Sequence, residues 1–205
     1  MNLIQYRYTV LLFSSLLLAA CATTYVTDSW KDETYKAPVN KVLVIGMTAD
    51  MSRRKIFEQT IVSKFIAEGK EAVVSFEAFN DGGSITKELL TPYIQQNAID
   101  SVLVTRLVDT KKTKIWASKS GSSRTMPNQY NNLFMYHDPS YGVAYDAART
   151  KEDVVLFLES NLYETKAAKI IWSMSSRSHN PKDLEKDVKE FSKLIIKNLG
   201  KKGLL

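Results

Sequence analysis

The chain has 205 residues, and its 28 lysines and arginines against 22 acidic residues give a net charge of +6. A chain of this length can bury a substantial core, so we expect one domain. Its single cysteine excludes an intramolecular disulfide. The basic residues are spread along the chain without a block of like charges, so we expect no nucleic-acid partner.

The first 21 residues carry the pattern of a secretion signal. Arg7 stands in a short polar start, and an apolar run follows from Tyr8 to Leu18. Two alanines then precede Cys21, as small residues precede a cleavage site. The run is well short of the roughly 20 residues that a membrane-spanning helix needs. We therefore predict that residues 1–20 are a signal peptide, with an uncleaved anchor or plain secretion as the alternatives.

The sequence Leu18-Ala19-Ala20-Cys21 resembles the lipobox of bacterial lipoproteins. The resemblance implies that the signal is removed and that Cys21 becomes the acylated first residue, held in a membrane by its lipid chains. Each buried methylene contributes roughly 0.8 kcal/mol, so more than one chain makes such anchoring stable. Ala22 rather than aspartate follows the cysteine, which in Gram-negative lipoproteins implies sorting to the outer membrane.

Residues 21–39 are polar, contain Pro38 and lack a sustained period. They predict a flexible tether between Cys21 and a domain over 40–205, with Trp30 and Tyr35 lying on the domain surface.

The first half of the domain predicts alternating strands and helices. The apolar run Val42–Ile45 predicts a buried strand. Ser52 then caps a helix that extends to about Glu68 and is ended by Gly69. A second strand is expected over Ala72–Phe79.

A second helix begins at Ser84. Pro92 falls inside it and predicts either a kink or two short helices, with Thr91 capping the second. A third strand follows from Ser101 to about Val108, with an extension toward Ala117 left open.

The second half predicts a hairpin and a final helix. Its strands are Val154–Glu164 and Lys169–Ser176. Asn180 is expected to cap the helix, with Pro181 at its first position and Asp183 in its first turn, and Gly200 to end it. The order β-α-β-α-β-loop-β-β-α predicts an α/β fold in which helices pack on a mixed parallel and antiparallel sheet.

Four short stretches resemble a family of small bacterial lipoproteins. They are KVLVIGM (41–47), the helix with Arg53-Arg54 and Phe57-Glu58, DSVLVTRLV (100–108) and LESNLYETKAAKIIWSMSS (158–176). The element order is similar to the α/β domain of the TolB N-terminal region, of LpoB-type penicillin-binding-protein activators and of CsgG-type secretion lipoproteins. The resemblance implies a periplasm-facing adaptor domain, with no activity of its own.

Three arginines are candidates for anion binding. Arg53 and Arg54 stand at the start of a helix, where an anion is favoured, although either could instead be solvated or paired with a nearby carboxylate. Arg106 stands among apolar strand residues. It either projects into a cleft or pairs, on a half-exposed face, with Glu159 or Glu164 on a neighbouring strand.

No pattern points to catalysis, a metal or a cofactor. Neither of the phosphate-binding motifs GxGxxG and GxxxxGK[ST] occurs. No serine lies in a GxSxG sequence. His137 and His179 are too few to form a metal site without several carboxylates, so both are expected to be surface loop residues. Trp116 and Trp172 are expected to pack on the sheet.

The segment 118–150 is the leading candidate for partner binding. Inserted loops longer than roughly 12–15 residues are usually functional or disordered. This one mixes aromatic residues with Ser, Asn and Gly, a composition typical of adaptable recognition surfaces. Its candidate contact residues are Tyr130, Phe134, Tyr136, Tyr141 and Tyr145. A disordered insertion without a function is the alternative.

The sequence therefore predicts a non-enzymatic outer-membrane lipoprotein that binds another envelope protein, or copies of itself. A second hypothesis is a binding module for a small anion or a cell-wall glycan at the ends of strands 42–45 and 101–108. A hydrolase with an unrecognised site is the third.

Overall fold

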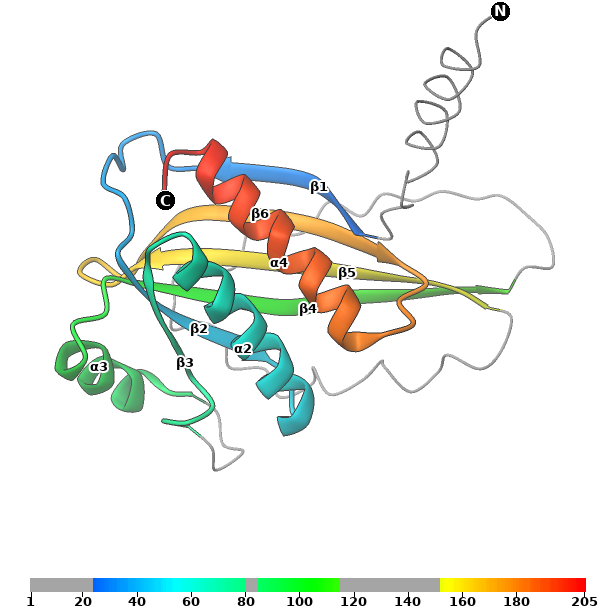
Figure 1. Cartoon of the computed structure of the whole chain (residues 1–205), viewed down its shortest axis with the longest axis horizontal. Helices are drawn as coiled ribbons and strands as arrows, with labels where there is room; N and C mark the ends of the chain where they lie inside the picture. The colour runs from blue at the N-terminus through cyan, green and yellow to red at the C-terminus, as the bar shows by residue number, and fades with distance from the viewer. Residues whose placement is uncertain (1–23, 80–84, 115–151) are drawn as a thin grey trace, which may run out of the picture.

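The computed structural model describes residues 24–79, 85–114 and 152–205 (Figure 1). These residues form one six-stranded sheet in the order β1-β6-β5-β4-β2-β3. The strands are β1 (Thr24–Lys31), β2 (Lys41–Met47), β3 (Glu71–Val74), β4 (Ser101–Lys114), β5 (Glu152–Glu164) and β6 (Lys169–His179). The helices are α2 (Met51–Ala67), α3 (Lys87–Gln96) and α4 (Leu184–Lys201).

The sheet is mixed, as its element order predicts. β2 is parallel to both β3 and β4, whereas β4, β5, β6 and β1 form antiparallel pairs. The parallel strands are joined through helices and β5 is joined to β6 by a hairpin turn, so the predicted α/β class is confirmed.

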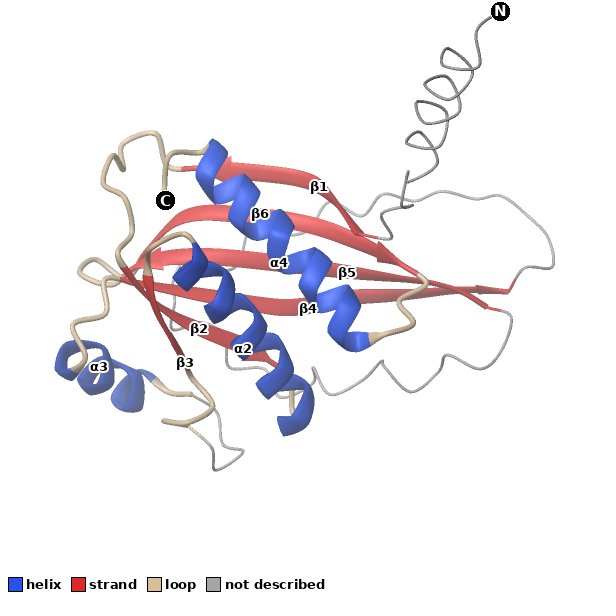
Figure 2. Cartoon of the chain, in the orientation of Figure 1, coloured by secondary structure: helices blue, strands red, loops and turns tan. Residues whose placement is uncertain are grey.

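Helices cover the two faces of the sheet unequally (Figure 2). α2 and α4 lie side by side on one face, where Phe65 and Ile195 pack against Val42, Val44 and Trp172. Strand residues of the opposite parity form a second cluster with α3, in which Leu90 packs with Leu43, Val102 and Val104. Because side chains alternate along a strand, α3 lies on the other face.

The segment predicted as a tether is partly a strand, so this prediction is wrong for residues 24–31. β1 pairs along β6 from Thr24↔Ser178 to Lys31↔Trp172, with an irregularity between Val26 and Asp28. That irregularity shifts the alternation of exposed and buried residues, which is why the sequence pattern lacks a period of two.

The predicted start of α2 at Ser52 is also wrong. The side chain of Asp50 accepts hydrogen bonds from the backbone of Ser52 and Arg53, so Asp50 is the cap. Gly69 follows α2 at a positive φ of 74°, which confirms its predicted role at the helix end.

α4 begins later than its sequence predicts. Its cap is Asp183, which accepts from the backbone of Lys186, whereas Asn180 has a φ of 47° and its side chain accepts from Val154 at the start of β5. α4 also continues through Gly200, and Gly203, at a φ of 68°, follows its end.

Two further elements differ from their predicted bounds. α3 is one helix that contains Pro92, so no second helix capped by Thr91 forms. β3 ends at Val74 rather than Phe79, and just beyond its end the Glu58 carboxylate accepts from the backbone N–H groups of Ser75 and Phe76. Among the residues described, no helix is both long and apolar enough to cross a membrane.

Candidate partner-binding site

β1 forms one edge of the sheet and is firmly held there. The Thr24 hydroxyl donates to the Ser178 hydroxyl at 3.0 Å, and both side chains are buried. The Tyr25 ring stacks on His179 with centroids 5.7 Å apart, and its hydroxyl lies 3.2 Å from the His179 Nε2. Contacts at the start of the strand therefore fix it to the end of β6.

The far end of β1 is closed by an ion pair. The Asp32 backbone donates to Ile171 at 2.9 Å, and its carboxylate accepts from the Lys169 ammonium and from Thr34. The hydrogen bond from Lys169, followed by those from Thr34, holds the pKa of Asp32 well below its ordinary value. This carboxylate is therefore ionised at neutral pH and ties the end of the strand to the start of β6.

β1, the edge strand, carries exposed aromatic side chains. Within the described sheet β1 has a neighbouring strand on one side only. Of the four large apolar side chains exposed in the described residues, Tyr25 and Trp30 lie on β1, with exposed fractions of 42% and 47%, and the others are Ile66 and Leu89. Backbone donors and acceptors on a sheet edge, flanked by aromatic anchors, suit the addition of a strand from another protein.

The edge also carries features that restrict indiscriminate pairing. The irregularity next to Asp28 interrupts the regular register, and Asp28 itself is exposed. Bulges and charges on edge strands are common means of avoiding aggregation. The edge is therefore better suited to a partner strand of complementary shape and charge than to a regular, flat strand.

The opposite edge offers much less. β3 has only four residues, and its first residue, Glu71, forms an ion pair with Lys41 at 3.2 Å. Short, charged edge strands resist pairing with other chains.

The predicted anion site is not assembled from its three arginines. Arg53 pairs with Asp50 at 3.1 Å, and Arg54 is buried against Glu58 at 2.9 Å. Arg106 lies on the other face of the sheet, because it shares the parity of Val104 in the α3 cluster. Each arginine thus has its own carboxylate.

Arg54 and Glu58 form a buried polar cluster that fastens α2 to the strand ends. Besides Arg54, Glu58 accepts hydrogen bonds from the backbone of Gly46, Ser75 and Phe76 and from the Ser75 hydroxyl. Arg54 also donates to the Phe79 carbonyl and to Ser75. The cluster has a structural role, because the charged groups of Arg54 and Glu58 are buried and paired with each other.

Arg106 pairs with Glu159 at 2.7 Å, which is one of the two partners predicted for it. The expected half-exposed position is wrong, since Arg106 is only 4% exposed. Glu159 also accepts from Asn161. Farther along this face, Arg177 and Lys111 both lie over the Phe157 ring, 4.9 and 5.4 Å from its centroid.

The remaining candidates divide between described and undescribed parts of the chain. Trp172 packs in the core as predicted, and its indole donates to Asn198. His179 lies at the end of β6 against Tyr25 instead of in a loop. No group of three or more metal-ligating side chains occurs in the described ranges. Outside them lie Cys21, Trp116, His137 and all five aromatic candidates of segment 118–150: Tyr130, Phe134, Tyr136, Tyr141 and Tyr145.

Sequence reasoning assigned Trp30 to a tether and did not select Tyr25. Both lie in the stretch Thr24–Lys31, which is rich in β-branched and aromatic residues. That composition was the available indication of a strand.

Comparison with known proteins gives matches to solved structures only. No protein-family model matches the sequence, and no curated protein matches it. A PelC dodecamer from Paraburkholderia phytofirmans is 11% identical, covers 86% of this chain and 94% of its own, and has a TM-score of 0.42. Lipoprotein GNA1162 from Neisseria meningitidis is 12% identical, covers 79% and 99%, and has a TM-score of 0.41. Likenesses at these scores assign neither a family nor a function to this chain.

Proposed function

We propose that the protein is a non-enzymatic lipoprotein, acylated on Cys21, that binds another envelope protein or a second copy of itself through the edge of β1. In this proposal the domain is anchored in the outer membrane and faces the periplasm. It needs no cofactor, because its task is to hold a partner. The lipobox-like sequence before Cys21 supports the anchor.

The observation that carries the binding role is the exposed edge of β1 with its two aromatic side chains. Tyrosine and tryptophan contribute large contact areas with few rotatable bonds, and they dominate binding energies at interfaces. Here they flank a row of backbone groups that a partner strand can pair with.

Site-specific photo-crosslinking in intact cells tests this role. A photoreactive phenylalanine analogue replaces Trp30 in one variant and Leu89, on α3, in the other. The two side chains are matched in exposure, at 47% and 50%. We expect a discrete crosslinked species from position 30 and none from position 89. A species of twice the mass of the chain identifies a second copy as the partner.

The same experiment with Cys21→Ser separates the anchor from the interface. Where the partner is another envelope protein, we expect the position-30 species to disappear when the anchor is removed, because the protein then leaves the membrane where that partner resides. Identical crosslinks from positions 30 and 89, or none from either, would contradict binding through β1.

A further inference from the structure

Few residues separate Cys21 from the first strand of the sheet. β1 begins at Thr24, so three residue steps separate it from the cysteine. Even fully extended, three residues span at most about 11 Å. Thr24 is buried and hydrogen-bonded to Ser178, so the strand is held from its first residue.

We infer that one end of the sheet is held against the lipid headgroups, and this inference rests on the proposed acylation of Cys21. The lipid-facing end consists of the start of β1, the end of β6 and the residues that lead into α4. An acylated Cys21 lies at the bilayer surface. The three-residue connection then keeps Thr24 within about 11 Å of that surface.

The register of the sheet shows what else belongs to this end. Ser178 pairs with Thr24, and the adjacent His179 pairs with Val155 near the start of β5. Lys112, near the end of β4, pairs with Val154. Both points where residues 115–151 join the sheet are therefore at the lipid-facing end.

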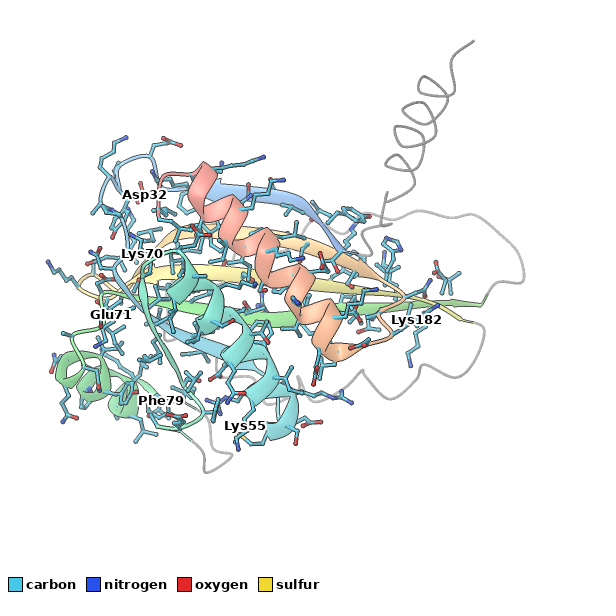
Figure 3. The ribbon with its side chains drawn as sticks, viewed as in Figure 1. Asp32, Lys55, Lys70, Glu71, Phe79 and Lys182 are labelled. Carbon is cyan, nitrogen blue, oxygen red and sulfur yellow. The ribbon has the colours of Figure 1, made fainter. Side chains whose placement is uncertain are left out.

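The opposite end of the sheet lies farthest from the anchor. It carries the turn between β5 and β6 and the chain's C-terminus, where Leu204 accepts a hydrogen bond from Val39. Asp32 and Lys182 mark the two ends, one beside the far end of β1 and the other beyond β6 (Figure 3). The ten residue steps of β6 place the ends roughly 33 Å apart.

This geometry limits where a partner can meet the protein. β1 starts at the lipid surface and has eight residues, so its whole edge lies within roughly 40 Å of the headgroups. Trp30, near the far end of β1, lies farther from the membrane than Tyr25, the other exposed aromatic residue of the strand. One end of the sheet thus contacts the lipid surface. A protein that binds β1 must therefore itself stay close to the membrane.

Fluorescence quenching by labelled lipids tests the orientation. Cys21 is the only cysteine, so once it is acylated an introduced cysteine is the only free thiol. Lys182→Cys and Lys166→Cys place a dye at opposite ends of β6, both at exposed lysines. The lipidated proteins are inserted into phosphatidylcholine vesicles that contain a lipid with a nitroxide headgroup.

We expect the dye at position 182 to be quenched at least threefold more than the dye at position 166. A second pair, Lys186→Cys and Lys201→Cys, repeats the comparison along α4. Equal quenching within both pairs, or stronger quenching at the far positions, would overturn the orientation. Circular dichroism verifies that each variant is folded.

Failure of the anchor is recognised separately. If the wild-type protein gains no acyl mass and does not float with vesicles, the proposed lipidation is wrong and the orientation falls with it. Flotation together with equal quenching overturns the orientation alone. Cys21→Ser is the control, and its labelled variants must show no quenching at either end.

Discussion

At the residue scale, Glu58 carries the densest set of buried contacts. It accepts from Arg54, from the Ser75 hydroxyl and from three backbone N–H groups. Removing one member of a buried ion pair leaves the other charge uncompensated. We therefore expect Glu58→Gln to lower the free energy of unfolding by about 3–5 kcal/mol in urea titrations.

The exposed pair of Glu190 and Lys193 is the matched control. Both side chains are about half exposed, at 46% and 52%. Glu190→Gln should change the free energy of unfolding by less than about 1 kcal/mol. An apolar replacement of both Arg54 and Glu58 should not restore stability, because it leaves the backbone donors of Gly46, Ser75 and Phe76 without their acceptor. Full recovery in that double variant would contradict this account.

Asp32 gives the fold a pH dependence in acid. Its pKa in the folded protein lies below the ordinary value of 3.8, chiefly because Lys169 donates to it. The folded state therefore binds fewer protons than the unfolded state, so this stabilisation is present above the ordinary pKa and is lost as the pH falls below it. We expect wild type to exceed Asp32→Asn in stability at about pH 6, with the difference shrinking below about pH 4.

Urea midpoints of both proteins across this pH range measure the difference. Other carboxylates contribute equally to both proteins, so the comparison isolates Asp32. A difference that stays constant through acid would show that the ion pair does not stabilise the end of β1.

At the scale of elements, the contact between β2 and α2 depends on a glycine. A Cβ atom added to Gly46 would lie 2.8 Å from Cδ1 of Phe57, whose ring is next to Phe191 of α4. Overpacking of this kind costs roughly 1–3 kcal/mol, and we expect Gly46→Ala to destabilise the protein by about that amount in chemical denaturation. Phe57→Leu in the same chain should recover part of the loss, since the two sites are coupled.

Gly200→Ala is the control for this substitution. Its Cβ would meet the nearest atom, in Leu205, at an ordinary 4.0 Å, and the residue lies within α4. Alanine is the better helix former by roughly 1 kcal/mol, so this variant should be as stable as wild type or more so. Equal losses at both glycines would rule out the Phe57 contact as the cause.

The elements also show which local sequence patterns are sufficient to predict a strand or a helix. The continuous apolar runs of β2 and β4 and the stripe of α4 identify them without tertiary information, because full burial requires apolar side chains at every inward position. Helix starts were less predictable. Asp50 and Ser52 are both good capping residues, as are Asn180 and Asp183, so residue type alone does not select the cap within each pair.

At the scale of the whole molecule, β1 makes residues 24–31 part of the domain. Removing it would expose the edge of β6 and the apolar contact of Val26 with the main core. We expect a chain of residues 33–205 to have a lower urea midpoint than one of residues 22–205, and to associate through the exposed β6 edge. Denaturation and sedimentation measure the two effects. Equal midpoints for the two chains would restore the tether interpretation.

The sequence by itself determined the mixed α/β class, the strands of the sheet centre, the hairpin and the helices, because these elements bury apolar side chains in periodic patterns. Only the tertiary structure decided that residues 24–31 form an edge strand of the sheet. Thr24 and its partner Ser178 are 154 positions apart, and an irregular, half-exposed strand has no local pattern that reveals such a pairing. The same long-range pairing decided the candidate site, since the exposed positions of Tyr25 and Trp30 follow from the place of β1 at the sheet edge. Other tertiary contacts decided that Arg54 and Arg106 are enclosed, since Arg54 donates to Ser75 and Phe79 beyond its own helix and Arg106 pairs with Glu159 of the neighbouring strand.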